Sequence, residues 1–196
     1  MDHEATEGVV PLMNPRLTRA AAVEVLQRMQ QVVSAWERWA VRQAPEKFAE
    51  LVRERRRAGW IEEDLRFLGS SAAEPMEQDV RDLQEALSPA GAPSEATFLG
   101  AMYVMEGSTL GGQYIARHVE STLGLEPGRG DAYFNAYGAE TGAMWNRFKA
   151  VLARVPDEQS GEVIAAAKAM FRFFSDCMQG QPIDTAHSIA AASTYV

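Results

Sequence analysis

Cysteine is almost absent from this 196-residue sequence, in which Cys177 stands alone. A single cysteine excludes an intramolecular disulfide, a CxxC redox centre and a zinc site built from thiolates. Long apolar runs are also missing, since none approaches the ~20 residues that a membrane-spanning helix requires. The N-terminal stretch MDHEATEG is acidic and lacks the basic and then apolar order of a signal peptide. Together these absences predict a cytoplasmic protein without a membrane-spanning helix.

Positive charge is scarce, because 19 lysines and arginines stand against 27 aspartates and glutamates, for a net charge of −8. This balance gives no electrostatic support for binding to nucleic acid. A basic cluster, RERRR at residues 53–57, is interpreted as a solvated helix face. Hydrophobic residues make up 46% of the chain, which is enough for a substantial core. The length suits a single domain.

Strand patterns are missing as well, because no stretch of useful length alternates apolar and polar residues. Apolar residues instead recur every three or four positions, which is typical of helices packed against a core. Thr18 and Ser94 are suited to cap two of these helices, and Gly59 to form a hinge between two others. We expect an all-α, single-domain, multi-helix bundle over residues 1–180 and a loosely ordered tail at 181–196. The expected helices cover residues 17–42, 45–57, 60–68, 76–87, 98–123, 139–155 and 158–179, with a linker at 88–96 and a turn at 124–131.

The stretch YVMEGSTLGGQYIARH, residues 103–118, places three glycines inside a helical pattern. Each interior glycine costs about 1 kcal/mol relative to alanine, so some other interaction should offset about 3 kcal/mol. Gly107 and Gly111 share one face of the helix, with Gly100 two turns before them and with Ser108 and Gly112 in the adjacent row. Such a stripe without side chains fits either close helix–helix packing or a flat cofactor against the backbone. A phosphate-binding loop does not fit, because no strand precedes the glycines and no lysine follows them.

The same stretch, with FLGAM before it, resembles the distal helix of bacterial biliverdin-producing heme oxygenases, especially the branch associated with bacteriophytochromes. Three other segments are similar to parts of this family. DHEATEGVVPLMNPRLT at residues 2–18 resembles its proximal region, RAGWIEEDLRFLG at 57–69 its central tryptophan-bearing segment, and YGAETGAMWNRFKAVL at 137–152 a later helix. The resemblance covers nearly the whole chain. It implies a heme oxygenase-like bundle in which a glycine-kinked distal helix lies over one face of heme.

The resemblance also selects among possible iron ligands. His3 is followed four residues later by Glu7, as the proximal ligand of the family is, and neutral imidazole suits an oxygen-activating heme. His118 lies about 600° of helical rotation beyond the last glycine of the stretch, so it should point away from the stripe as a surface or capping residue. Cys177, in the apolar context FFSDCMQ, is interpreted as a buried structural thiol. His3 is therefore the expected ligand.

Around the glycine stripe, the resemblance implies a distal wall that controls bound oxygen. Gly107, Ser108, Gly111 and Gly112 would form this wall, where oxygen meets backbone and ordered water rather than bulky side chains. Ser108 stands where mammalian relatives carry an aspartate that organises water. Water must here be held by backbone carbonyls, by this hydroxyl or by another polar residue. Glu106, beside the wall, fits equally well as a distal acid and as a salt-bridge partner in the bundle.

The resemblance also implies residues that would contact the propionates of heme. Tyr103, one turn before Gly107, matches a tyrosine that hydrogen-bonds a propionate in related bacterial enzymes, although a core tyrosine with its hydroxyl at the surface fits equally well. Arg147 and Lys149 are candidates for charge pairing with the propionates, or else ordinary solvated residues. On the last helix, core packing is expected for several large side chains, some of which could line a pocket: Phe171, Phe173, Phe174 and Met178.

By resemblance, heme would be both cofactor and substrate, opened oxidatively to biliverdin with release of carbon monoxide and ferrous iron. The chain has no flavin or nicotinamide motif and no iron–sulfur cysteines, so an external donor such as ferredoxin must supply electrons. A bacteriophytochrome is the implied recipient of the bilin. A non-catalytic heme- or bilin-binding protein of the same fold remains the main alternative. A thiaminase-like bundle would use Cys177 as nucleophile, and a di-iron carboxylate enzyme would need a Glu-x-x-His motif that the sequence lacks.

Overall fold

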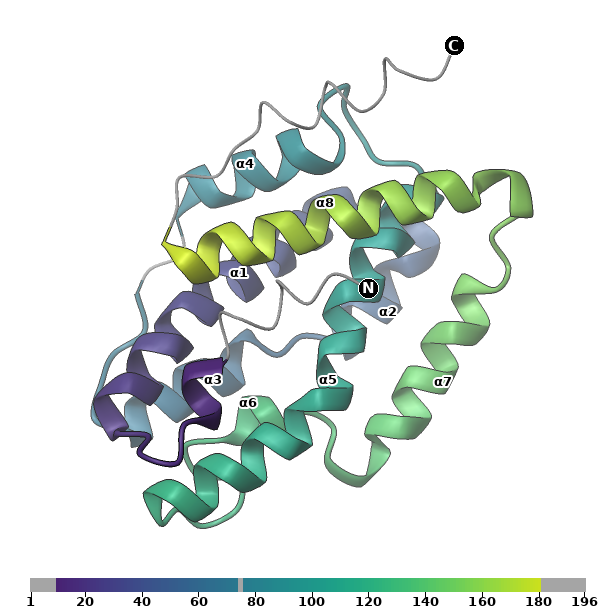
Figure 1. Cartoon of the computed structure of the whole chain (residues 1–196). Helices are drawn as coiled ribbons and strands as arrows, with labels where there is room; N and C mark the ends of the chain where they lie inside the picture. Colours follow the sequence, from purple (N-terminus) through teal and green to yellow (C-terminus); the bar gives the residue numbers. More distant parts are fainter. Residues whose placement is uncertain (1–9, 74–75, 181–196) are drawn as a thin grey trace.

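The computed structural model describes residues 10–73 and 76–180, and every regular element in these residues is a helix. The all-α class is therefore confirmed (Figure 1). The α-helices are α1 (Arg19–Gln43), α2 (Ala49–Glu54), α3 (Ala58–Phe67), α4 (Glu77–Leu87), α5 (Glu95–Leu123), α6 (Ala132–Asn135), α7 (Thr141–Leu152) and α8 (Ser160–Gln179). Short 3-10 helices are η2 (Val10–Met13), η3 (Glu46–Phe48), η4 (Gly138–Glu140) and η5 (Asp157–Gln159).

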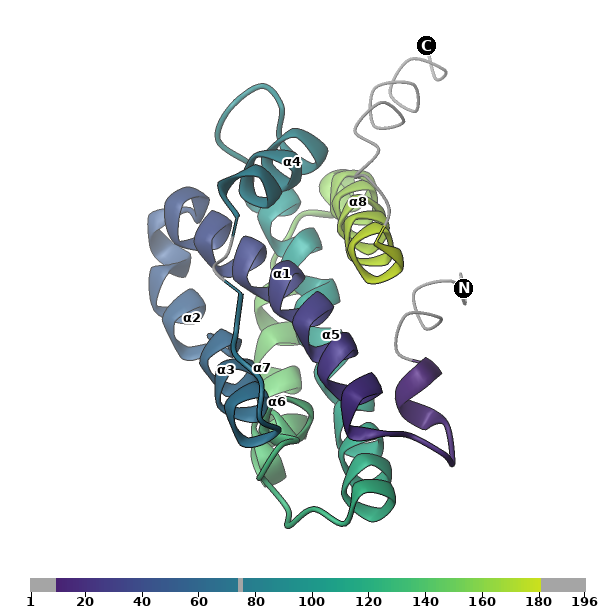
Figure 2. The same ribbon diagram turned by 90° about the vertical axis from the view of Figure 1, so that its left-hand side faces the viewer.

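Helix α1 begins at the predicted cap. Thr18 is extended, and its hydroxyl oxygen accepts a hydrogen bond from the backbone N–H of Ala21 at 3.2 Å. The apolar face of α1 packs against α3, α4 and α8. Figure 2 shows α1 crossing in front of α5, with α2 and α3 on one side and α8 on the other. Helix α1 therefore lies between α3 on one side and α8 on the other.

An aromatic cluster joins the first half of the chain to α5. Phe98 of α5 packs against Trp36 and Trp39 of α1 and against Phe48 of η3. The ring centroids of these pairs, and of the pair Trp36–Trp39, lie 5.5 to 5.9 Å apart. Each ring is buried. The indole N–H of Trp39 also donates to Gln84 of α4 at 2.7 Å, which satisfies the polar atom of a fully buried side chain. This cluster fixes where α5 starts relative to α1.

The break between α2 and α3 lies at residues 55–57, so the predicted hinge at Gly59 is wrong, and Gly59 is the second residue of α3. The reason is a tertiary contact. The carboxylate of Glu37, on α1, accepts the backbone N–H groups of Arg57 and of Ala58, the latter at 2.8 Å. It thereby satisfies unpaired donors at the first turn of α3. A cap supplied from α1 leaves no local signal in the sequence.

Helix α5 starts at the predicted cap, Ser94. It begins at Glu95, where Ser94 accepts the N–H of Thr97 at 3.0 Å, and it ends at Gly124, whose φ of 66° is left-handed. It runs unbroken through its glycines and packs most extensively on α8, with α6 and α7 along its other sides. Figure 1 shows that its axis is not straight. A kink at the glycine pair itself stays a prediction.

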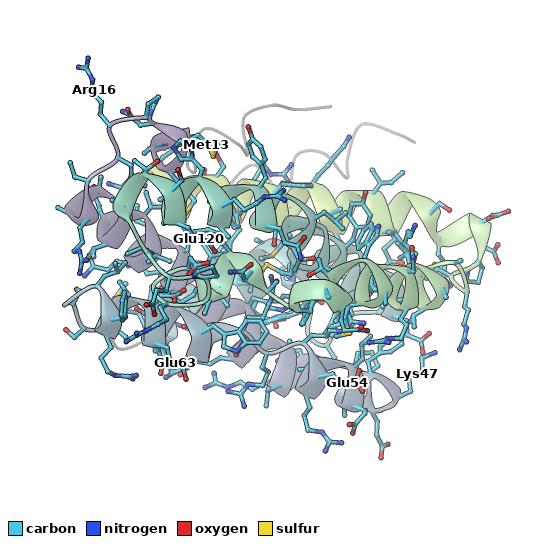
Figure 3. The ribbon with its side chains drawn as sticks, turned by 90° about the horizontal axis from the view of Figure 1, so that it is seen from below. Met13, Arg16, Lys47, Glu54, Glu63 and Glu120 are labelled. Atoms are coloured by element: carbon cyan, nitrogen blue, oxygen red, sulfur yellow. The ribbon has the colours of Figure 1, made fainter. Side chains whose placement is uncertain are left out.

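Charged side chains cover the outside of these helices. Figure 3 shows Arg16, Lys47, Glu54 and Glu63 directed away from the body of the molecule. Within residues 10–73 and 76–180, no helix combines the length and the apolar character needed to cross a membrane. Side-chain burial is instead concentrated between α1, α5 and α8, which is where the candidate site lies.

Candidate functional site

Two glycines of α5 permit close packing against neighbouring backbone. A Cβ atom added at Gly100 would overlap the carbonyl oxygen of Val163 at the start of α8. One added at Gly112 would overlap the carbonyl oxygen of Phe134 in α6. Close helix–helix packing, the first interpretation of the glycine stripe, therefore accounts for these two positions. Gly112 also borders the cavity described next.

Gly107 and Gly111 face open space. A Cβ at Gly107 would meet only the ring of Trp145, at 3.9 Å, and one at Gly111 would meet nothing within 4 Å. The space is a cavity of about 440 Å³, within the usual size range of small-molecule sites. Parts of α1, α5, α6, α7 and α8 form its walls, together with the α2–α3 break. Six aromatic side chains line it: Tyr103, Tyr133, Phe134, Trp145, Phe171 and Phe174.

The mouth of the cavity is apolar and exposed. Tyr103 and Leu110 of α5 are 39% and 49% exposed, and Phe171 of α8 is 42% exposed. Tyr103 lies beside Trp145 of α7, with ring centroids 5.4 Å apart. Large apolar side chains gathered around an opening are typical of a site that takes up an apolar molecule. Phe174 lines the interior behind this mouth.

Polar groups in the cavity wall are few, and several are bonded to the backbone of α5. Arg57 is only 4% exposed, and its Nη2 donates to the carbonyl of Met105 at 2.6 Å. Ser108 donates to the same carbonyl at 2.7 Å, and Thr109 donates to the carbonyl of Glu106, also at 2.7 Å. The wall around Gly107 therefore carries a buried positive charge and hydroxyl groups whose protons already have acceptors.

Residues 53–57 are not a uniformly solvated face, so that prediction is wrong for Arg55 and Arg57, which are buried. Arg55 forms a buried ion pair with Glu106, and both side chains are at most 3% exposed. The Nη2 of Arg55 also donates to the carbonyl of Met144 at 3.1 Å, and the hydroxyl of Tyr137 donates to Glu106 at 3.1 Å. Glu106 is thus a salt-bridge partner in the bundle, the second of its two predicted roles.

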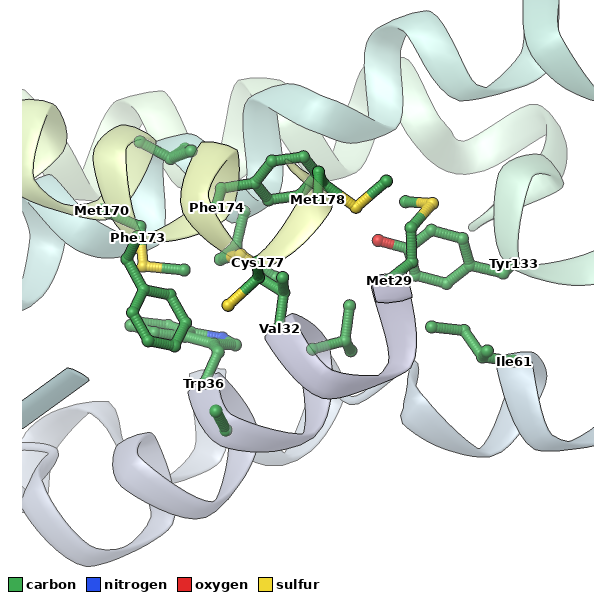
Figure 4. Close-up of a cluster of buried hydrophobic side chains, with 14 of the residues drawn as sticks. Met29, Val32, Trp36, Ile61, Tyr133, Met170, Phe173, Phe174, Cys177 and Met178 are labelled. Carbon is green, nitrogen blue, oxygen red and sulfur yellow. The ribbon is translucent and has the colours of Figure 1, made fainter. Parts of the chain in front are cut away.

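Helix α6, which was not predicted, carries Tyr133 and Phe134 into the cavity wall. Asp64 of α3 fixes its start, because the two carboxylate oxygens accept the N–H groups of Ala132 and Tyr133 at 2.9 Å each. Burial nevertheless raises the pKa of Asp64 to about 6. Figure 4 shows Tyr133 and Met29 in the cluster of buried side chains, and both residues line the cavity.

A second carboxyl at this end of α6 predicts a pH effect. Burial raises the pKa of Asp131, and the nearby carboxyl group of Glu120 raises it further. A proton held by the folded but not the unfolded state stabilises the fold below the unfolded pKa, and this stability is lost as pH rises through the folded pKa. We expect the unfolding free energy, from urea denaturation, to fall between pH 5 and pH 8. In Asp131→Asn the fall should be smaller by on the order of 1 kcal/mol. An equal fall in both proteins would show that Asp131 is ionised throughout.

Arg147 and Lys149, the candidate propionate partners, lie on α7 outside the cavity wall. Arg147 is exposed, and its Nη2 is directed to the sulfur of Met144. The Lys149 ammonium lies 5.9 Å from the ring centroid of Trp145, which does line the cavity. Lys149 therefore stands near the cavity edge, whereas Arg147 is turned elsewhere. Contact with a propionate stays a prediction for both.

The expected iron ligand, His3, lies outside the described residues, as does His187. His118 is off the cavity, and its Nε2 donates to the carbonyl of Asn14 at 3.2 Å, in line with the surface role predicted for it. Cys177 is a buried thiol whose pKa is raised to about 12 by burial, so its inert structural role is supported. Over residues 10–73 and 76–180, no group of three or more His, Cys, Asp or Glu side chains could hold a metal ion.

The cavity residues that were missed in the sequence include Arg57, Tyr133, Phe134 and Trp145. The run DAYFNAY at residues 131–137 holds three aromatic residues within seven positions, and this density could have indicated a buried element. Trp145 lies in a predicted helix but was not singled out. Arg57 carried no usable signal, because its burial depends on the tertiary cap that breaks the helix there.

Comparisons with known proteins agree on one family. The family model described as "Heme oxygenase" matches residues 2–180. A curated protein of Xanthomonas campestris pv. campestris (strain 8004), named "Heme oxygenase", is 35% identical over 130 residues, which cover 65% of this chain and 70% of the relative. A solved structure of heme oxygenase from Leptospira interrogans superposes with a TM-score of 0.70 at 18% identity, covering 90% of this chain and 91% of that one. The solved structure supports the fold, and the first two comparisons support the family.

Proposed function

Since the chain belongs to the heme oxygenase family, we propose that it binds heme in the α5 cavity and opens it to biliverdin, with release of carbon monoxide and ferrous iron. The observation that carries the proposal is the wall formed by Gly107 and Gly111, where an added Cβ would meet only the ring of Trp145 or open space. A flat macrocycle can approach a backbone of this kind more closely than it could approach any side chain. Only glycine allows that approach.

The cavity fits a flat, largely apolar molecule with a charged edge. Its aromatic lining provides apolar contact for a macrocycle, and its mouth is open beside Tyr103 and Phe171. Carboxylates at the edge of such a ligand could remain near solvent, within reach of the Tyr103 hydroxyl and of Lys149 on α7. Bound heme supplies the oxygen-activating redox chemistry, and the protein supplies orientation and control of water.

Residues of the inner wall would control the environment of the reacting atoms. The backbone at Gly107 and Gly111 limits the height available above the ligand. The buried guanidinium of Arg57 favours negative charge that develops nearby, because a fixed charge in a low-dielectric site acts without reorganisation. Arg57 is held in place by the carbonyl of Met105 and, through its backbone N–H, by Glu37.

The iron ligand in this proposal is His3. Among the described residues that line the cavity, none is a histidine or a cysteine, so an imidazole ligand has to come from another part of the chain. His118 and Cys177 are both committed elsewhere. The position of His3, four residues before Glu7, is the one that the family resemblance favours.

We further propose an external reductant of the ferredoxin type and, from the resemblance to the phytochrome-associated branch, a bacteriophytochrome as recipient of the bilin in the cytoplasm. The sequence motifs that would bind a flavin or a nicotinamide are missing from the chain. Single electrons delivered in turn suit a donor that docks transiently. These partners are separable from the heme-binding step and can be tested after it.

The test is heme titration of the purified full chain, followed by absorption spectra with ferredoxin and its reductase. We expect a Soret band that bleaches as a biliverdin band appears. His3→Ala should weaken heme binding by at least about tenfold, equivalent to ~1.4 kcal/mol. The matched control is His118→Ala, which should bind heme as the wild type does. A stable Soret band that never bleaches would instead identify a heme-binding protein without oxygenase activity.

A further inference from the structure

The hydroxyl of Tyr133 lies near that of Ser108, but it is buried and has no partner of regular hydrogen-bond geometry among the described residues. Tyr133 is 4% exposed and lines the α5 cavity. A buried hydroxyl left unpaired is disfavoured, and most buried tyrosines find a partner. An unpaired hydroxyl in a cavity wall points to a partner that enters the cavity.

The position of this hydroxyl is tightly fixed. The backbone N–H of Tyr133 donates to Asp64, and the guanidinium carbon of Arg57 lies 5.4 Å from the ring centroid. The ring of Phe134 packs edge-on at 5.4 Å. Contacts on both the backbone and the ring therefore hold the Tyr133 side chain in place. A donor held in this way suits a ligand whose place is also fixed.

The neighbouring hydroxyl groups already donate their protons to the backbone. The protons of Ser108 and Thr109 are donated to carbonyls of α5, and Arg57 uses Nη2 in the same way. Tyr103 stands at the mouth, where solvent can serve it. Burial raises the pKa of Tyr133 by more than Arg57 and the Ser108 hydroxyl lower it, so the O–H proton is retained at neutral pH.

We propose that Tyr133 is a positioning residue whose hydroxyl donates a hydrogen bond to a small oxygen ligand, water or dioxygen, held in the cavity beside Gly107 and Gly111. This inference rests on the proposed function, because heme would fix the place of that ligand. The hydroxyl of Tyr133, on α6, would then help to order this water, and Ser108 would not do so alone. The sequence alone leaves open which polar residue organises this water.

The test measures the affinity of fluoride, an anionic acceptor, for the ferric heme complex. Tyr133→Phe should weaken fluoride binding by about tenfold, since a hydrogen bond to an anion is lost. Carbon monoxide, a weak acceptor, should bind the reduced complex of this variant with nearly wild-type affinity. Unchanged fluoride affinity in Tyr133→Phe would overturn the proposal.

Tyr137→Phe is the matched control. Its hydroxyl donates to the buried Glu106, and it does not line the cavity. This variant should lose stability in urea denaturation while binding fluoride as the wild type does. Tyr133→Phe should show the opposite pattern, with unfolding unchanged and fluoride binding weakened. An equal loss of fluoride affinity in both variants would assign the effect to general loosening and would overturn the proposal.

A heme-free crystal structure separates this proposal from the proposed function. We expect an ordered water within hydrogen-bond distance of the Tyr133 hydroxyl, inside the cavity. A hydroxyl bonded to a protein carbonyl instead would overturn the role of Tyr133 even if heme binds. A wild-type chain that takes up no heme would remove the proposed function, and the water in the crystal would then decide whether Tyr133 presents its donor to the cavity.

Discussion

Replacing Glu106 with alanine is expected to lower the unfolding free energy by about 3–5 kcal/mol. The substitution leaves the guanidinium of Arg55 buried without its counter-charge, and both side chains of the pair are at most 3% exposed. It also removes the acceptor of the Tyr137 hydroxyl. Stability would be measured by urea denaturation of the heme-free protein, so that ligand binding does not contribute.

Two further variants serve as a control and a rescue for Glu106→Ala. Glu54→Ala removes a carboxylate that points away from the molecule in Figure 3, and it should change stability by less than about 0.5 kcal/mol. The double variant Arg55→Met with Glu106→Leu removes both charges and should recover much of the loss, since no unpaired ion stays buried. A loss below about 1 kcal/mol in Glu106→Ala would mean that water reaches the pair.

Replacing Gly111 with leucine should lower heme affinity by about 10- to 100-fold. The new side chain would fill the part of the cavity in which the proposed function places heme. A Cβ at this position meets nothing within 4 Å, so the heme-free fold should tolerate the change. Stability should even rise by up to about 1 kcal/mol, since leucine favours a helix over glycine. Heme titration and urea denaturation of the same preparation would test both effects.

Two other glycines provide the controls for Gly111→Leu. Gly161 on α8 is exposed and has open space around it, so Gly161→Leu should leave heme binding unchanged. Gly100→Ala should instead destabilise the protein by about 1–3 kcal/mol, because the added Cβ overlaps the carbonyl of Val163. Wild-type heme affinity in Gly111→Leu would mean that heme does not lie against this face of α5.

The sequence revealed the helices because their periodicity and their caps are local. Thr18 and Ser94 cap α1 and α5 as predicted, since a hydroxyl that accepts an N–H three residues later needs no distant partner. The break before α3 could not be predicted, because Glu37 caps α3 from another helix. Helix α6 was missed for the same reason, as Asp64 holds its first turn from α3.

The candidate site was only partly accessible from sequence. The stripe in α5 was recognised, but the sequence could not show that Gly100 and Gly112 serve packing while Gly107 and Gly111 face a cavity. That distinction depends on which neighbour each face meets. The burial of Arg57 likewise depends on a carbonyl 48 residues further along the chain.

The walls of the cavity come from α1, α5, α6, α7 and α8 and from the α2–α3 break, so a molecule seated there would touch segments from Met29 to Phe174. Such a ligand acts as a non-covalent cross-link between distant parts of the chain. Mass action then couples occupancy to melting temperature, and a ligand at 100 times its Kd adds about 2.7 kcal/mol to the folded state. If the protein also degrades its ligand, this stabilisation lasts only while more ligand is supplied. The melting temperature would be highest when heme is bound and no electrons have yet been delivered. It would be lowest after the product has dissociated.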